Sequence, residues 1–428
     1  MTSLGTHLRR IRSQFAQLPD KRRGSNTQYA MEDIAMAALS VFFMQSPSFL
    51  AHQRTLAEQQ GRSNAQTLFG LDRIPCDNHL REMLDGMPPE YFNPQFHDLV
   101  DDLQQGGGLA PMRRLDGRLL IALDGTQTFH SRKLHCPNCS TRVKNGNTEY
   151  FHQMLAATVV APGQAQTGPL PPEFIAPQDG HLKQDCEREA AKRWLERHGP
   201  RCAGLNPVYL GDALFACQSI CQTLLDHGGD FLLTCKPGSH KTLYEYTEGV
   251  TLPTRRVSRG KGIQRRIFHY RWITDIPIRD GQDALRVNWL EVIIQRPNGT
   301  VTFRSAYLTN LDVNRDNVAE LAECARARWK IENETFNVLK RQGYHLEHNF
   351  GHGKDTLASV LVLLNLLAFA LHTVFDLTQL QWQQARQRLG ARKRLFEHLR
   401  SITCYQVFPS WNHLLSGLAT GQPSIRSP

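Results

Sequence analysis

Two apolar runs that each end in an aspartate constrain the fold more than any other feature of this sequence. RLLIALDGTQTF places Asp124 at the end of a predicted buried strand, and NPVYLGDALF does the same for Asp212. A carboxylate at such a position is costly to bury without a partner. Because neighbouring strands can end at one edge of a sheet, we expect the two carboxylates to lie close together. For either aspartate alone, a turn or helix-capping role is an equally good interpretation.

A third acid is expected from a helix predicted over residues 325–341. This helix carries Glu332 and Glu334, which lie about 200° apart around its axis, so only one of them can face the site. Arg328 precedes Glu332 by one turn, and a cation beside a carboxylate helps to keep it ionised. An ordinary surface ion pair with i,i+4 spacing has the same pattern. The order strand-Asp, strand-Asp, β-rich segment, helix-Glu is what favours one joint site.

Three carboxylates on a rigid scaffold suit a divalent metal ion. Mg²⁺ prefers carboxylate oxygens and keeps water and substrate among its ligands. Two such ions, roughly 3.5–4 Å apart, can activate a nucleophile and neutralise charge on the phosphate while a phosphodiester is cut. We therefore expect Asp124, Asp212 and Glu332 to be the catalytic residues and to bind Mg²⁺, for which Mn²⁺ can substitute.

The charge balance favours a polyanionic partner. Fifty Lys and Arg against 40 Asp and Glu give a formal net charge of +10, which favours nucleic acid, although a basic protein need not bind any. The first run of basic residues (Arg9, Arg10, Arg12, Lys21, Arg22 and Arg23, with Asp20) belongs either to a DNA-binding domain or to a solvated tail. In RRVSRGKGIQRR, the residues expected to contact DNA phosphates are Arg255, Arg256, Arg265 and Arg266.

The segments around the three acids predict a mixed α/β sheet covered by helices and interrupted by a β-rich insertion. Within that insertion, Asn298-Gly299 predicts a hairpin. Before it, a helix is predicted over 179–199 and ends at Gly199. The expected units are a helical N-terminal DNA-binding domain (1–110), the first part of the core (111–237), the β-rich insertion (238–312), the second part of the core with the Glu helix and a packing helix (313–380), and a basic C-terminal segment (381–428).

Three features bear on where the protein resides. The apolar run from Leu357 to Leu371 is short for a membrane span and contains Ser359 and Asn365, so we expect a buried core helix and no membrane. The N-terminus lacks the apolar core of a signal peptide. Ten cysteines in such a chain then indicate a reducing cytoplasm rather than a disulfide scaffold.

Other residue types suggest further sites. Cys136 and Cys139 form a CxxC, half of a structural zinc site, which His130 and His152 could complete; reduced cysteines in a turn are the alternative. Loop histidines His345, His348 and His352 could contact DNA or metal, but satisfied loop residues are the simpler interpretation. Trp272 and Trp289 could stack on an unpaired base, whereas tryptophan in a β-rich segment is more often part of the core.

At its acidic residues the chain resembles the DDE transposases of bacterial insertion sequences, in particular the group with a Tyr-Arg-Glu-Lys signature. The resemblance covers most of the chain. It includes LDGTQTF, YLGDALF and, most specifically, RARWKIENETFNVLKRQGYHLEHNFGHGK. It implies an RNase H-like mixed-sheet catalytic core with a β-rich insertion, preceded by a mostly helical N-terminal domain. It also implies Mg²⁺-dependent cleavage at the ends of the element and strand transfer into target DNA.

The sequence departs from that signature at two positions. The signature has Tyr three residues before the Arg, where this chain has Ala325, and Lys seven residues after the Glu, where it has Leu339. Lys340 follows one residue later, and one residue turns a side chain by about 100° on an α-helix. Arg328 and Glu332 match the signature, Lys340 matches it only with that offset, and the Tyr has no counterpart. In relatives these residues help to hold DNA near the cleaved end.

We therefore expect a metal-dependent DNA transposase, acting as endonuclease and strand transferase. Its partners would be double-stranded DNA, as transposon ends and as target, and a second copy of the chain in a homodimeric DNA complex. Such a protein would be cytoplasmic and associated with the bacterial nucleoid when bound. Two alternatives are a DNA-binding regulator derived from a transposase and a structure-specific nuclease of the same fold.

Overall fold

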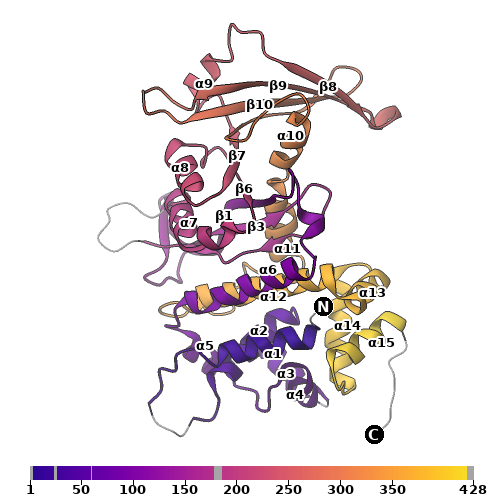
Figure 1. The fold of residues 1–428 in the computed structure, drawn as a ribbon. Coiled ribbons are helices and arrows are strands. Elements are labelled where there is room, and N and C mark those ends of the chain that lie inside the picture. Colours follow the sequence, from indigo (N-terminus) through magenta and orange to yellow (C-terminus); the bar gives the residue numbers. More distant parts are fainter. Residues whose placement is uncertain (1–2, 24–26, 59, 178–185, 422–428) are drawn as a thin grey trace.

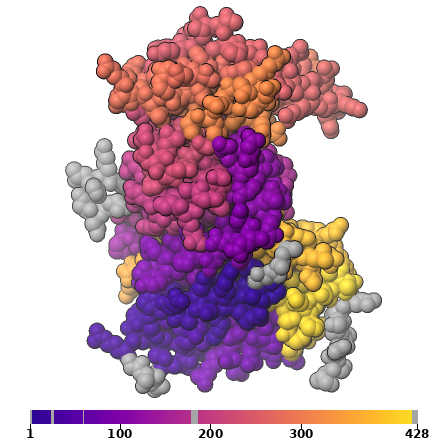
Figure 2. Space-filling view, viewed as in Figure 1, coloured from indigo at the N-terminus to yellow at the C-terminus, as the bar shows by residue number. Residues whose placement is uncertain are grey.

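The computed structural model describes residues 3–23, 27–58, 60–177 and 186–421. Figure 1 shows three tiers: a β-meander at the top, a mixed sheet with helices in the middle, and a layer of helices at the bottom. In Figure 2 the bottom tier combines the N-terminal helices with the C-terminal ones, so the two ends of the chain share one layer.

The middle tier is built on a sheet that contains both antiparallel and parallel strand pairings. β1 (Leu119–Ser131) pairs antiparallel with β3 (Asn147–Val160) and parallel with β6 (Pro207–Gly211), which pairs parallel with β7 (Asp230–Cys235). The two short strands β4 and β5 pair with β3. This order confirms the expected mixed α/β sheet. The remaining strands of this tier are β2 (Ser140–Lys144), β4 (Gly168–Pro169) and β5 (Glu173–Ile175).

Burial explains why the apolar runs form the centre of the sheet. The first five residues of β1, Leu119 to Leu123, and all five residues of β6 are buried. Strands covered on both faces are continuous apolar runs rather than alternating ones. Each run ends where the chain emerges from the core, and the next polar residue is Asp124 on β1 and Asp212 after β6.

The β-rich insertion extends the same sheet. Its last strand, β11 (Val301–Thr309), pairs antiparallel with β7 of the core. The predicted hairpin is confirmed, because Gly299 has φ 87° in the turn between β10 (Arg286–Gln295) and β11. Trp272 and Trp289 are buried, so they belong to the core and stacking on a base is ruled out for both. The other elements of the insertion are α9 (Lys241–Glu245), β8 (Thr254–Arg259), η3 (Gly262–Gln264) and β9 (Arg266–Pro277).

Helices α7 (Glu187–Ala203) and α8 (Gln218–Asp226) pack beside the sheet. The helix predicted over 179–199 corresponds to α7. The prediction that it ends at Gly199 is wrong, because α7 continues through Pro200 to Ala203. A Cβ at Gly199 would lie 2.9 Å from Cβ of His227, so the glycine allows a close approach rather than a helix stop. Most of the predicted start of this helix, residues 179–185, falls outside the described residues.

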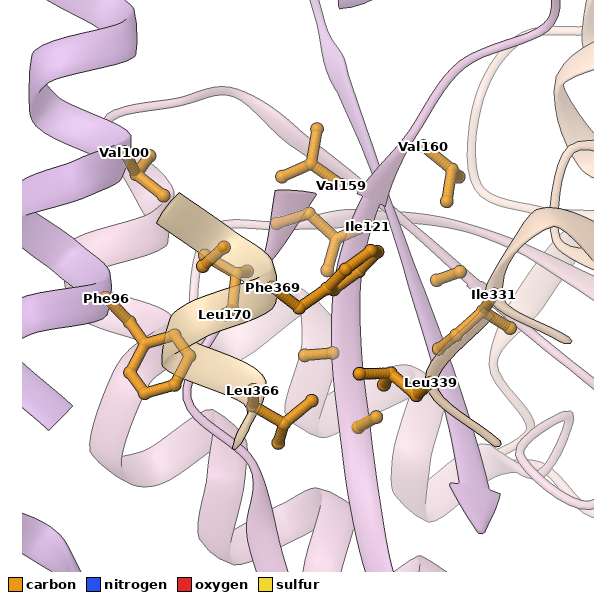
Figure 3. Close-up of a cluster of buried hydrophobic side chains, with 14 of the residues drawn as sticks. Phe96, Val100, Ile121, Val159, Val160, Leu170, Ile331, Leu339, Leu366 and Phe369 are labelled. Atoms are coloured by element: carbon orange, nitrogen blue, oxygen red, sulfur yellow. The ribbon is translucent and has the colours of Figure 1, made fainter. Parts of the chain in front are cut away.

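The apolar run forms α12 (Leu357–Thr378), which joins the middle and bottom tiers. It packs against α2 (Met31–Phe43), α6 (Asn93–Gln105) and β4. Figure 3 shows Leu366 and Phe369 of α12 among side chains of the sheet and of α6. By length and composition α12 could cross a membrane, but 83% of its most apolar window is buried inside the fold. The prediction of a core helix is therefore confirmed.

The bottom tier is helical, as predicted, but its basic residues are largely paired. Arg10 forms an ion pair with Asp102, and Arg12 forms one with Asp33. The C-terminal helices pack against α1, α3 and α4 of the N-terminal region. The elements of this tier are α1 (Leu4–Phe15), α2 (Met31–Phe43), α3 (Phe49–Ala57), α4 (Gly61–Phe69), α5 (Asp77–Leu84), η1 (Pro89–Phe92), α6 (Asn93–Gln105), η2 (Ala110–Met112), α13 (Leu380–Leu389), α14 (Arg392–Tyr405) and α15 (Trp411–Thr420).

Asp85, which follows α5, caps the N-terminus of α12 from outside. Its carboxylate accepts hydrogen bonds from the backbone N–H groups of residues 354–357, at 2.7–3.1 Å. Partial burial opposes ionisation of Asp85, but these four bonds outweigh it, so its pKa lies below the usual range. A carboxylate whose pKa is lowered by folding stabilises the fold above its unfolded-state pKa and ceases to do so as the pH falls through the folded-state value.

We predict that Asp85→Ala lowers the free energy of unfolding by about 1–2 kcal/mol at pH 7, because four N–H groups lose their acceptor. Denaturant unfolding measures this change. The neighbouring Glu82→Ala, at an exposed position of α5, should change stability by less than about 0.5 kcal/mol. The difference between Asp85→Ala and the wild type should shrink below about pH 4. Equal effects of the two substitutions at pH 7 would contradict the capping role.

Candidate active site

Two of the three expected acids meet at one buried arginine. Nη1 of Arg328 donates to Oδ2 of Asp124 and to Oε1 of Glu332, each at 3.1 Å. The Arg328 side chain is only 10% exposed, and its guanidinium also lies over the half-exposed ring of Trp329. The expected i,i+4 pair is therefore present, and it faces the end of β1 rather than the surface.

The pairing of β1 with β6 brings Asp212 to the same place. In their parallel register Ala122 is opposite Leu210, so Asp124 and Asp212 each follow two residues beyond a matched pair. Oδ1 of Asp212 accepts the backbone N–H of Leu214 at 2.7 Å, which fixes the turn after the strand. The negative charge of Asp212 acts on Asp124, which agrees with their closeness.

A fourth carboxylate, Glu187, was not anticipated from the sequence. It is the first residue of α7 and is half-buried, and burial together with the charge of Asp212 raises its pKa. A Cβ on Gly125 would overlap the Glu187 carboxylate, so the glycine after Asp124 makes room for it. The sequence features that could have indicated Glu187 are the glycine directly after Asp124 and the position of Glu187 in the first turn of a helix.

Burial is the largest influence on Asp124 and raises its pKa to about 7. The positive charge of Arg328 opposes this shift, whereas the charges of Glu332, Glu187 and Asp212 add to it. Like-charged carboxylates in a poorly solvated place disfavour each other's ionisation. The ionisation of Asp124 therefore depends on the cations near it, Arg328 among them.

The segment that carries Glu332 is not the continuous α-helix predicted over 325–341. α10 (Val318–Arg326) ends first, η4 (Ile331–Phe336) is π-helical, and α11 (Asn337–Arg341) follows. A π-helical turn closes i→i+5 bonds and takes up one more residue than an α-turn, and such turns are frequent at functional sites. Ile331 of η4 and Leu339 of α11 are buried, and Figure 3 shows both in the cluster of buried side chains that also contains Ile121 of β1.

The π-helical turn changes the interpretation of Lys340. On an α-helix, the offset between seven and eight residues after Glu332 would turn the side chain by about 100°. The extra residue of the π-turn compensates for most of this rotation. Nζ of Lys340 is 2.9 Å from Oε1 of Glu347. Leu339, at the signature position by count, is fully buried.

The basic residues of the insertion lie apart from the acids, around β8, η3 and the start of β9. Arg256 and Arg265 are exposed. Arg265 donates to the Ser258 hydroxyl, and Arg266 donates to two backbone carbonyls. Arg255 donates to the carbonyls of residues 315 and 316. Figure 2 shows this region at the top of the molecule, far from the helical tier.

The CxxC lies in a cluster that matches the prediction except for one histidine. Sγ of Cys136 and Sγ of Cys139 each lie 3.4 Å from Nε2 of His152, as anticipated. The second histidine is His352 rather than His130, which forms an ion pair with Glu149 at 3.3 Å. His352 comes from the loop before α12, more than 200 residues away in sequence, so spacing alone could not identify it.

Comparison with known proteins shows the family to which the chain belongs. No curated protein sequence matches the chain. A family model described as the transposase DDE domain matches residues 124–370, which is more than half of the chain. The matched range begins at Asp124 and includes Asp212 and Glu332, and its mixed sheet is that of an RNase H-like fold. The chain therefore belongs to the DDE transposase domain family.

Proposed function

We propose that this transposase cuts DNA at the ends of a mobile element and joins them to target DNA, using Asp124, Asp212 and Glu332. The observation that carries the proposal is the convergence of these acids from β1, the end of β6 and η4. Strand ends and a packed helical segment give a rigid scaffold, which metal-dependent phosphoryl transfer requires. Family membership supports the reaction class.

The side chains present suit a divalent cation. All the acids offer hard carboxylate oxygens, the ligands that Mg²⁺ and Mn²⁺ prefer. The raised pKa of Asp124 is caused mainly by burial and further by the charges of Glu332, Glu187 and Asp212, and it supports a site where a bound cation would be favourable. Asp124, Asp212 and Glu332 would hold the cation, and Glu187 adds charge next to them. When bound, the metal supplies activation of the attacking hydroxyl and neutralisation of charge on the phosphate.

The residues of the chain itself have separate tasks in this proposal. Asp124 and Asp212 would bind the cation from the strand ends of the sheet. Glu332 would bind it from the helical segment η4. Arg328 fixes the positions of the Asp124 and Glu332 carboxylates by a hydrogen bond to each. Its guanidinium could also contact a phosphate oxygen of DNA bound at this edge of the sheet. Lys340, half-buried and paired with Glu347, is placed to exchange that partner for a DNA phosphate.

We assign the main DNA contacts to the insertion. Arg255 and Arg256 lie on β8, and Arg265 and Arg266 lie where the chain enters β9. In the N-terminal tier, by contrast, Arg10, Arg12 and Arg22 are paired with acids. A complex that holds two element ends needs two copies of the chain, so we propose a homodimer on DNA. Because its substrate is DNA, we propose that the protein acts in the cytoplasm and is associated with the nucleoid when it is bound to DNA.

Replacing each catalytic acid with its amide tests the proposal. Asp124→Asn, Asp212→Asn and Glu332→Gln keep side-chain size but remove a metal-binding charge. Each should lower cleavage and strand transfer of an end-bearing oligonucleotide by about a thousandfold or more with Mg²⁺, because several kcal/mol of charge stabilisation are lost. Folding and end-specific DNA binding should stay near normal.

Glu334→Gln is the matched control. Glu334 is half-buried in η4 and is not among the charges that act on Asp124, so this variant should retain activity. An inactive Glu334→Gln beside an active Glu332→Gln would show that the wrong acid was chosen. Wild-type cleavage without joining would favour the nuclease alternative, and DNA binding without cleavage would favour the regulator.

The raised pKa of Asp124 predicts pH-dependent metal affinity. Below about pH 7 the folded protein holds a proton on this carboxyl that a cation must displace, and above it the carboxyl is ionised. Mg²⁺ affinity should therefore fall by up to about tenfold per pH unit below pH 7 and level off above it. Calorimetry in buffers of different ionisation enthalpy should detect proton release on binding near pH 7, absent in Asp124→Asn. Equal affinity at pH 6 and pH 8 would be inconsistent with this account.

The salt dependence of DNA binding tests the insertion. Each lost phosphate contact reduces the slope of log K against log salt by about 0.9. Alanine at Arg255, Arg256, Arg265 and Arg266 together should flatten the slope measurably. Arg279→Ala with Arg286→Ala is the matched control, because these arginines of the same meander are paired with Asp283 and Asp275. An unchanged slope in the fourfold variant would refute the role of the insertion.

A further inference from the structure

Outside the active site, four metal-binding side chains from three segments meet. The cysteines lie in the loop between β1 and β2, one histidine is on β3, and the other is in the loop between α11 and α12. All four ligand atoms lie within 4.8 Å of one another, and three of the four residues are buried. The members of this Cys₂His₂ cluster are Cys136, Cys139, His152 and His352.

Four of the six distances among the ligand atoms agree with a tetrahedral zinc ion. Zn–S and Zn–N bonds of about 2.3 and 2.0–2.1 Å place two sulfurs about 3.8 Å apart and a sulfur and a nitrogen about 3.5 Å apart. The two Sγ atoms are 3.9 Å apart. The three S···N distances from Cys136 and Cys139 to His152, and from Cys139 to His352, are 3.4, 3.4 and 3.6 Å.

The composition of the cluster also favours zinc over the metal of the active site. Two thiolates and two imidazoles are ligands for Zn²⁺, whereas Mg²⁺ takes oxygen ligands. Two thiolates balance the double charge of the ion, so the assembled site can be buried at little electrostatic cost. The backbone N–H of Cys136 donates to Sγ of Cys139 at 3.4 Å, which helps to hold negative charge on that sulfur.

We propose that the Cys₂His₂ cluster binds one structural zinc ion, which fastens the loop 342–356 to the first strands of the sheet. This loop follows α11 and leads into α12, so it connects the segment carrying Glu332 to the core helix. A second tie lies beside the cluster, where Nδ2 of Asn138 donates to the carbonyl of Asp355 at 2.8 Å. The proposal concerns metal content and folding and does not depend on the DNA reaction.

Metal analysis of the full chain, purified without chelator, tests the site. We expect about one zinc per chain. Cys139→Ser and His352→Asn should lose it, whereas Cys76→Ser, at an exposed free cysteine, and His130→Asn should keep it. Zinc retained by Cys139→Ser or His352→Asn would overturn the proposal. So would wild-type protein that contains no zinc even after dialysis against it.

Cobalt substitution gives a readout that does not depend on the variants folding. Wild-type protein loaded with Co²⁺ should show the intense visible absorption of tetrahedral cobalt and the charge-transfer band of bound thiolate. The weak spectrum of octahedral cobalt would overturn the assignment. The fastening role is tested by amide hydrogen exchange: chelation should speed exchange in residues 345–353 but not in the β10–β11 turn. Unchanged exchange in 345–353 would remove that role.

Discussion

The crowding of four partly buried carboxylates at one edge of the sheet is the constraint on which the site depends. Four acids gather where β1 and β6 end, and Arg328 contacts two of them. Burial raises the pKa of Asp124 to about 7, so folding holds the site in a state that a cation would stabilise. The rest of the structure can be understood as the scaffold that keeps these charges together. The four acids are Asp124, Glu187, Asp212 and Glu332.

That scaffold holds its acids in two different ways. The parallel register of β1 and β6 fixes two acids through backbone hydrogen bonds. Glu332 depends instead on side-chain packing, because Ile331 and Leu339 fit against the sheet and α12, as Figure 3 shows. The π-turn of η4 lets Ile331 and Leu339 pack inward while Glu332 and Lys340 stay on the polar side. The proposed zinc site would hold the loop that follows this segment.

The sequence predicted what depends on neighbouring residues. The strand-end aspartates, the i,i+4 pair of Arg328 with Glu332, the Asn298-Gly299 hairpin and the buried apolar helix all follow from local periodicity and turn chemistry. The features that were missed depend on contacts between distant segments. Glu187 approaches only because Gly125 leaves space, and His352 reaches Cys139 from another loop. Arg10 of the basic N-terminal run had no acidic partner nearby in the sequence, because its partner Asp102 lies far along the chain.

A crystal structure that locates the divalent cation would test whether Asp124, Asp212 and Glu332 bind the catalytic metal. Crystals of the protein soaked in Mn²⁺ would give an anomalous signal at each bound ion. The account predicts a peak in contact with the carboxylates of Asp124, Asp212 and Glu332, and no peak there in Asp124→Asn. Manganese bound elsewhere, with these three carboxylates lacking a metal at saturating concentration, would contradict it.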